Sequence, residues 1–164
     1  MTQPLPATND EVSTSERRQT ILVVDDEQDL RSLVANVLGE YGYKVITAAN
    51  AAKAITMLEK MDAPPDLLLT DVVMPGMNGR VLAEQLLPRQ PGMRVLYMSG
   101  YTDSFIAGHG VLEPGTYLVH KPFTEEELIR KVREVLDYRK KTVPAIGDVA
   151  ELAGTSSGAA SRRN

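Results

Sequence analysis

Short, uninterrupted runs of apolar residues recur along this chain and constrain its fold more than any other feature. The runs occupy residues 21–24, 43–48, 67–69, 95–98 and 117–119, of which 43–48 and 117–119 are the weaker two. Runs of this length without polar alternation are typical of strands that are buried on both faces, as in a parallel sheet. The sequence therefore predicts five buried strands.

Amphipathic helical patterns separate these runs. Apolar residues recur at helical spacing in residues 30–38, 54–61, 79–87 and 128–136, and we expect a further helix over residues 103–112, although it contains Gly108 and Gly110. Thr124 and Glu127 have the spacing of a capping box before the last helix. Five strands that alternate with five helices predict a doubly wound α/β fold with a parallel sheet, for which the flavodoxin-like strand order 2-1-3-4-5 is a common solution.

The length of 164 residues fits one domain with tails at both ends. We expect a disordered head over residues 1–19, because this segment is rich in proline, serine, threonine and charge. The domain should occupy residues 20–140, and residues 141–164 should form a flexible tail that could contain a short helix near 146–152.

Composition argues against several classes of partner. The chain carries 18 basic and 22 acidic residues and no cysteine, and nothing in this balance indicates binding to nucleic acid or to an anionic membrane. No apolar run approaches the roughly 20 residues that span a bilayer, and the polar first residues do not form a signal peptide. We therefore expect a cytoplasmic protein.

Polar residues stand at the ends of four predicted strands. Asp25 and Asp26 follow the first strand, Asp71 the third, Ser99 the fourth and Lys121 the fifth. In a parallel α/β sheet these ends meet at one edge, where such folds bind ligands. Converging carboxylates repel one another and raise one another's pKa, and Mg²⁺ would relieve this because it favours carboxylate oxygens.

These residue types fit phosphoryl transfer. Asp71 would be the nucleophile, while Mg²⁺, Lys121 and Ser99 would neutralise the phosphoryl oxygens. Less specific roles exist for each residue: Asp25 or Asp26 could cap the following helix, Ser99 could begin a turn and Lys121 could be a surface lysine. We expect capping to be at most a secondary role, assigned to Asp26.

Four segments resemble the signature segments of response-regulator receiver domains from two-component signalling, of the chemotaxis-regulator type. They read VVDDE, TDVVMPGMNG, MSGYTD and HKPFT, in the family's order and spacing. The resemblance implies that Asp25, Asp26, Asp71 and the Val73 carbonyl bind Mg²⁺. It further implies that Asp71 accepts the phosphoryl group, that Ser99 and Lys121 contact this group, and that the Lys121–Pro122 bond is cis. The last two segments are most similar to receivers of hybrid sensor histidine kinases.

Two positions depart from the family pattern. The residue three before the lysine is usually aromatic in receivers, but here it is Leu118, and Tyr117 should point to the other face of the sheet. We expect a change in helix 103–112 to carry the signal to a partner, on a face that includes Leu118 and His120. Val73 and Tyr101 should border the path of the hydrolytic water, and neither offers a carboxylate or amide to orient it.

The sequence thus predicts a phosphoacceptor module rather than an enzyme with external substrates. Its donor would be a histidine kinase or a phosphotransfer protein, its output an unknown partner protein, and its state a monomer or weak dimer. No DNA-binding output domain is visible. Three alternatives are a receiver fragment of a hybrid histidine kinase, a receiver that works without phosphate, and a haloacid-dehalogenase-like phosphatase. The last is disfavoured because Val73 stands where that family needs a second aspartate.

Overall fold

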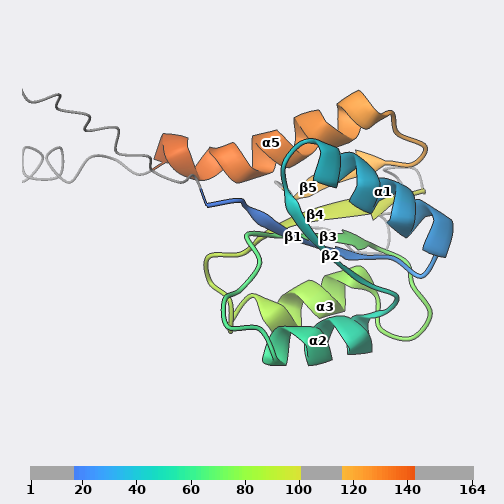
Figure 1. Ribbon diagram of the computed structural model, residues 1–164. Coiled ribbons are helices and arrows are strands. Elements are labelled where there is room, and N and C mark those ends of the chain that lie inside the picture. The colour runs from blue at the N-terminus through green and yellow to red at the C-terminus, as the bar shows by residue number, and fades with distance from the viewer. Residues whose placement is uncertain (1–16, 101–115, 143–164) are drawn as a thin grey trace, which may run out of the picture.

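The protein contains a five-stranded sheet with helices on both faces (Figure 1). The computed structural model describes residues 17–100 and 116–142. The strands are β1 (Thr20–Val24), β2 (Lys44–Ala48), β3 (Leu67–Asp71), β4 (Arg94–Ser99) and β5 (Tyr117–His120). Each predicted apolar run lies within a strand or begins one residue before it.

Four of the five expected helices fall within the described residues. These are α1 (Gln28–Glu40), α2 (Ala51–Glu59), α3 (Gly79–Leu86) and α5 (Glu125–Thr142). The helix expected over 103–112 and the short tail helix expected near 146–152 lie outside the described residues, as does most of the expected head. No described helix is both long enough and apolar enough to cross a bilayer.

The strands are parallel and lie in the order β2-β1-β3-β4-β5. This confirms the predicted doubly wound, flavodoxin-like sheet. The order reverses direction between β1 and β3, because the chain first adds β2 on one side of β1 and then returns to add the remaining strands on the other. A cleft for ligands is expected beyond the carboxyl ends of the strands at such a switch point.

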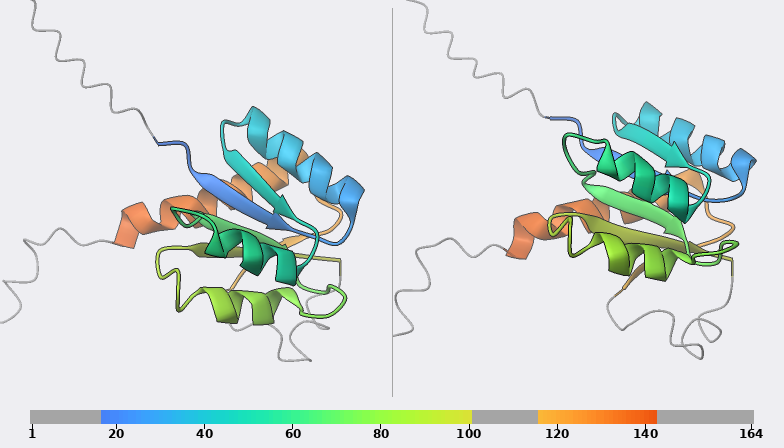
Figure 2. Two further views of the ribbon diagram at one scale, coloured as in Figure 1. Left: turned by 60° about the horizontal axis from the view of Figure 1, so that its bottom comes forward. Right: turned by 90° about the horizontal axis from the view of Figure 1, so that it is seen from below.

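Alternate residues of each strand enter two separate apolar layers. One layer packs the sheet against α1 and α5, and the other packs it against α2 and α3, which lie side by side (Figures 1 and 2). In β1, for example, Ile21 and Val23 belong to the first layer and Leu22 and Val24 to the second. Both faces of the central strands are therefore buried, which is why their sequences read as continuous apolar runs.

The helix starts show which capping predictions hold. At α5, the Thr124 N–H donates to Glu127 Oε2 at 2.8 Å and the Glu127 N–H donates to Thr124 Oγ1 at 3.1 Å, which confirms the capping box. At α1, however, the assignment of a capping role to Asp26 was wrong. The N-cap residue is Glu27, which makes no side-chain cap bond, and it is Asp25 Oδ1 that accepts from the Glu27 N–H at 2.9 Å.

Gly79, the first residue of α3, holds the loop after β3 against the strand end. Its N–H donates to the Val72 carbonyl at 2.9 Å. A Cβ atom at this position would lie 2.0 Å from the Asp71 carbonyl oxygen and 3.0 Å from Thr70 Oγ1. Because the clash is with backbone, which cannot rotate away, only glycine permits this close approach.

We predict that Gly79→Ala destabilises the fold by about 1–3 kcal/mol, the usual cost of forcing extra volume into a packed site. Urea unfolding followed by circular dichroism measures this. Gly39→Ala in α1 is the matched control, because a Cβ there meets nothing within 4 Å and alanine is favoured over glycine in a helix. Equal midpoints for Gly79→Ala and the unsubstituted protein would contradict the close-approach argument.

Candidate functional site

The polar residues at the strand ends come together at one edge of the sheet. Asp25 follows β1 directly, Asp71 ends β3, Ser99 ends β4 and Lys121 follows β5. Because β1, β3, β4 and β5 are successive neighbours in a parallel sheet, their carboxyl ends share one edge. This edge lies beside the start of α1, on the right of Figure 1.

Three carboxylates form a cluster there. Asp25, Asp26 and Asp71 each offer an oxygen atom, and these atoms lie within 4.8 Å of one another. Asp25 is fully buried and Asp71 is 9% exposed, whereas Asp26 is exposed. The donor set consists of carboxylate oxygens with one side open to solvent, which suits a hard divalent cation that keeps part of its water shell.

Lys121 bridges the two buried carboxylates. Its Nζ atom lies 3.0 Å from Asp25 Oδ2 and 3.0 Å from Asp71 Oδ2. The Lys121 N–H donates to the Ser99 carbonyl at 2.7 Å, and the Lys121–Pro122 bond is cis, as the resemblance to receivers predicted. Burial by itself lowers the pKa of Lys121, but the hydrogen bonds to Asp25 and Asp71 and the negative charges of these carboxylates together outweigh burial and raise the pKa, so the ammonium stays charged.

The site disfavours the ionised form of Asp71. Burial raises the pKa of its carboxyl group above the ordinary value, while the hydrogen bond and charge of Lys121 act in the opposite direction and the Asp25 charge adds to the increase. From the sequence, repulsion between carboxylates was expected to raise the pKa. In the structure, burial of Asp71 raises its pKa more than the charge of Asp25 does. Positive charge at the site would favour the ionised form that a nucleophile requires.

Two backbone contacts orient the end of β3. The Val73 N–H donates to Asp71 Oδ1 at 3.3 Å, and Thr70 Oγ1 donates to the Asp71 carbonyl at 3.0 Å. The Val73 side chain is 47% exposed at the rim of the site. Ser99 is 1% exposed at the end of the adjacent strand.

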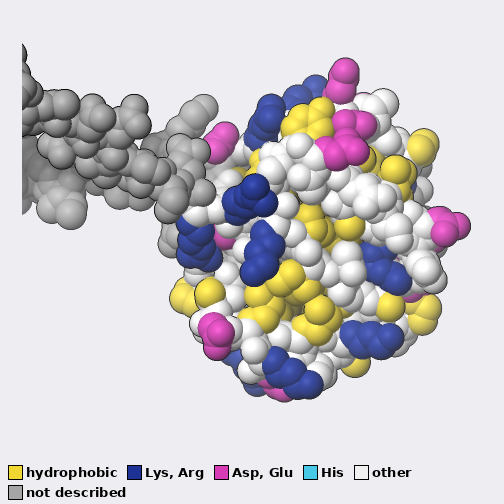
Figure 3. Space-filling model, in the orientation of Figure 1, with side chains coloured by type: hydrophobic (Ala, Val, Ile, Leu, Met, Phe, Trp, Pro, Cys, Tyr) yellow, Lys and Arg dark blue, Asp and Glu magenta, His cyan; other side chains and the backbone are white. Residues whose placement is uncertain are grey.

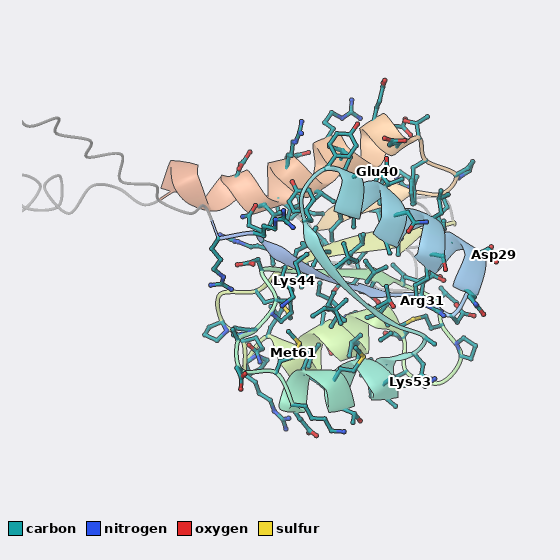
Figure 4. The ribbon with its side chains drawn as sticks, viewed as in Figure 1. Asp29, Arg31, Glu40, Lys44, Lys53 and Met61 are labelled. Carbon is teal, nitrogen blue, oxygen red and sulfur yellow. The ribbon has the colours of Figure 1, made fainter. Side chains whose placement is uncertain are left out.

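Arg31 is a contact that sequence reasoning missed. This residue lies one turn into α1, and its Nη1 atom donates to the Asp25 carbonyl at 2.7 Å (Figure 4). The bond ties α1 to the strand end that carries the acidic pair. The only signal in the sequence is a basic residue six positions after Asp25, which many exposed helix faces would also show.

The positions that depart from the family pattern lie around β5. Leu118 is half-buried and packs into the layer of α2 and α3, whereas Tyr117 packs into the layer of α1 and α5. The two side chains therefore point to opposite faces, as predicted. His120 is exposed at the end of β5, next to Lys121. Tyr101 lies outside the described residues.

Known proteins match most of this chain. The response regulator receiver domain model matches residues 21–133. The sensor kinase CckA of Brucella abortus is 30% identical over 118 residues, which cover 72% of this chain but 12% of the kinase. The DNA-binding response regulator MtrA of Mycolicibacterium smegmatis is 33% identical over 136 residues, covering 80% of this chain and 58% of MtrA. The chain thus spans only part of the length of these relatives.

Solved structures agree with this match. A response regulator receiver protein from Sinorhizobium medicae superimposes with a TM-score of 0.66 at 31% identity, covering 76% of this chain and 98% of that structure. The receiver domain of the hybrid histidine kinase CckA gives 0.60 at 32% identity, with 71% and 98% covered.

Receivers are phosphoacceptor signalling domains that pair with histidine kinases or phosphotransfer proteins. Because the family model covers more than half of the chain and the fold has the strand order expected for it, this protein belongs to the response regulator receiver domain family.

Proposed function

We propose that residues 20–140 form a receiver unit that accepts a phosphoryl group on Asp71 with the help of Mg²⁺ and thereby changes its affinity for a partner protein. The observation that carries this proposal is the bridge from Lys121 Nζ to Asp25 and Asp71 at 3.0 Å each. A lysine that is shared between two buried carboxylates supplies the positive charge that a transferring phosphoryl group needs.

Each residue has a defined part in the transfer. One Asp71 oxygen forms a bond to phosphorus while the phosphorus–nitrogen bond of the donor phosphohistidine breaks, and the histidine keeps that electron pair. Lys121 and the Ser99 hydroxyl neutralise the phosphoryl oxygens. Asp25, Asp26, Asp71 and the Val73 carbonyl would hold Mg²⁺, which supplies further charge neutralisation when bound.

The donor and the output are proteins in this proposal. A histidine kinase or a phosphotransfer protein delivers the phosphoryl group in the cytoplasm, and a separate partner reads the phosphorylated state. The match to CckA supports a second arrangement, in which the chain is the receiver part of a hybrid histidine kinase. The chain itself would turn over no external substrate, since Val73 supplies no acid beside Asp71.

The first test removes the acceptor. Wild-type protein mixed with acetyl phosphate and Mg²⁺ should gain one phosphoryl group, and Asp71→Asn should gain none, because an amide is not nucleophilic at this site. Chelation of Mg²⁺ should also abolish incorporation. Intact-mass spectrometry reads the result. Asp62→Asn, an exposed loop aspartate away from the carboxyl ends of the strands, is the control, and equal incorporation in Asp71→Asn and wild type would refute the assignment.

The second test concerns the output face. We predict that beryllofluoride, a phosphoryl mimic, changes amide hydrogen exchange between residues 100 and 120, in the segment expected to contain helix 103–112 and extending to Leu118 and His120. Such a change requires two arrangements of this face with different affinities for the mimic. Asp71→Asn should not respond. An unchanged exchange pattern in this segment of the wild type would count against the proposed switch.

The third test concerns the lifetime of the phosphorylated state. Val73 and Tyr101 offer no carboxylate or amide to orient a water for attack on phosphorus, so hydrolysis should be slow. The double variant Val73→Asn with Tyr101→Glu should lose phosphate faster, by up to roughly 10²-fold, the scale of one general-base contribution. Val73→Ala separates loss of bulk from gain of a hydrogen-bonding group. A double variant no faster than wild type would disprove the shielding argument.

A further inference from the structure

A second concave surface lies at the opposite end of the sheet from the carboxylate cluster. It is a cavity of about 450 Å³ beside the first residues of β1 and β2, within the size range of ligand sites. Figure 4 shows two of its residues, Lys44 and Met61, on one side of the molecule and Arg31 on the other. The cavity is lined by Arg17, Arg18, Thr20, Lys44, Ile46, Met61, Asp62 and Ala63.

Positive charge gathers in this cavity although the chain as a whole has a net charge of −4. Arg17, Arg18 and Lys44 line it together with a single acid, Asp62. Arg17 Nη2 lies 3.8 Å from Asp66 Oδ2, a long contact on an exposed side chain, while that oxygen already accepts from the Thr20 N–H at 2.7 Å. In the described parts of the chain, Arg18 and Lys44 have no ion-pair partner.

The cavity borders an open edge of the sheet. In the described sheet β2 pairs with β1 alone. The Lys44 N–H donates to the Gln19 carbonyl at 2.9 Å, and the Ala48 carbonyl accepts from the Asp25 N–H at 3.3 Å. Because peptide groups alternate in direction along a strand, those of Val45 and Thr47 point away from β1, toward the open edge. Such an edge is a template for another extended segment.

The floor of the cavity is apolar. Ile46 and Met61 form it, the exposed Ala63 also lines the cavity, and Figure 3 shows hydrophobic side chains beside Lys and Arg side chains on this face of the molecule. Ile46 and Met61 are half-buried and pack against the layer of α2 and α3. They continue the core to the surface rather than standing alone on it.

We propose that this face binds an extended acidic segment of a partner protein, which adds to the sheet as a strand beside β2. The backbone of the segment would pair with Val45 and Thr47, an apolar side chain would pack on Ile46 and Met61, and its carboxylates would meet Lys44 and the two arginines. Strand addition of this kind takes its affinity from main-chain hydrogen bonds and its specificity from side-chain pockets. A small anion would use the cations alone and leave the strand edge and the apolar floor uncovered.

This site is independent of the proposed phosphoryl chemistry. β1 and β2 have five residues each and run about 16 Å from their amino ends beside the cavity to their carboxyl ends, at about 3.3 Å per residue. The partner could therefore stay attached whether or not Asp71 carries a phosphoryl group. The surface would serve to hold a partner near the receiver rather than to read its state.

Nuclear magnetic resonance titration of the full chain tests the proposal with a short synthetic peptide in which valine alternates with threonine between pairs of glutamates. We expect shifts of the Val45 and Thr47 amides on addition of this peptide and none with its lysine-for-glutamate counterpart. Lys44→Glu should weaken binding about tenfold or more, because it replaces attraction by repulsion. Lys53→Glu, an exposed change on α2 outside this cavity, should not. Equal binding by both variants overturns the proposal.

Two further experiments distinguish strand addition from binding of a small anion and from a dependence on phosphorylation. Inorganic pyrophosphate should shift the Val45 and Thr47 amides less than the acidic peptide does. If pyrophosphate shifts residues 17, 18 and 44 while the peptide leaves Val45 and Thr47 unmoved, the cavity is a small-anion site and the proposal is wrong. Peptide affinity should be the same with and without beryllofluoride. If Asp71 failed to accept a phosphoryl group, the peptide titration would still test the proposed strand addition, because it does not depend on phosphorylation.

Discussion

The ammonium group of Lys121 lies between two carboxylates that the fold has removed from water, and the rest of the site depends on this contact. Asp25 is fully buried and Asp71 nearly so, and a buried carboxylate without a counter-charge costs several kcal/mol. The Nζ atom of Lys121 lies 3.0 Å from each carboxylate. Its charge stabilises an aspartate at the carboxyl end of both β1 and β3. In the proposed function, a bound cation or phosphoryl group would take over part of this charge compensation.

Three contacts hold Lys121, Asp25 and Asp71 in place. Arg31 ties α1 to the Asp25 carbonyl, and Gly79 lets α3 start against the Asp71 carbonyl where any side chain would clash. The Lys121 N–H is bonded to the end of β4. The charged groups are therefore positioned by helices and strands with buried apolar faces, which suits chemistry that relies on preorganised charge.

The two ends of the sheet differ in charge. Asp25, Asp26 and Asp71 outnumber Lys121 at the carboxyl ends of the strands. At the amino ends, Arg17, Arg18 and Lys44 outnumber Asp62 and Asp66. Separation along the strands keeps the two sets apart without any insulating element. The proposed phosphoacceptor site and the proposed surface for an acidic partner thus lie at opposite ends of one small domain.

Much of this could be read from the sequence alone. Continuous apolar runs predicted the five strands and helical spacing predicted the four described helices, because strands buried on both faces and amphipathic helices leave recognisable patterns. The strand order was expected as a common solution for such an alternation, and the structure confirms it. The polar residues at the strand ends could be named for the same reason. Only tertiary structure decided which atoms meet: that Asp25 rather than Asp26 binds the Glu27 N–H, that Arg31 reaches the Asp25 carbonyl, and that burial outweighs repulsion at Asp71. Such contacts depend on side-chain directions and distances between segments remote in sequence, which no local pattern encodes.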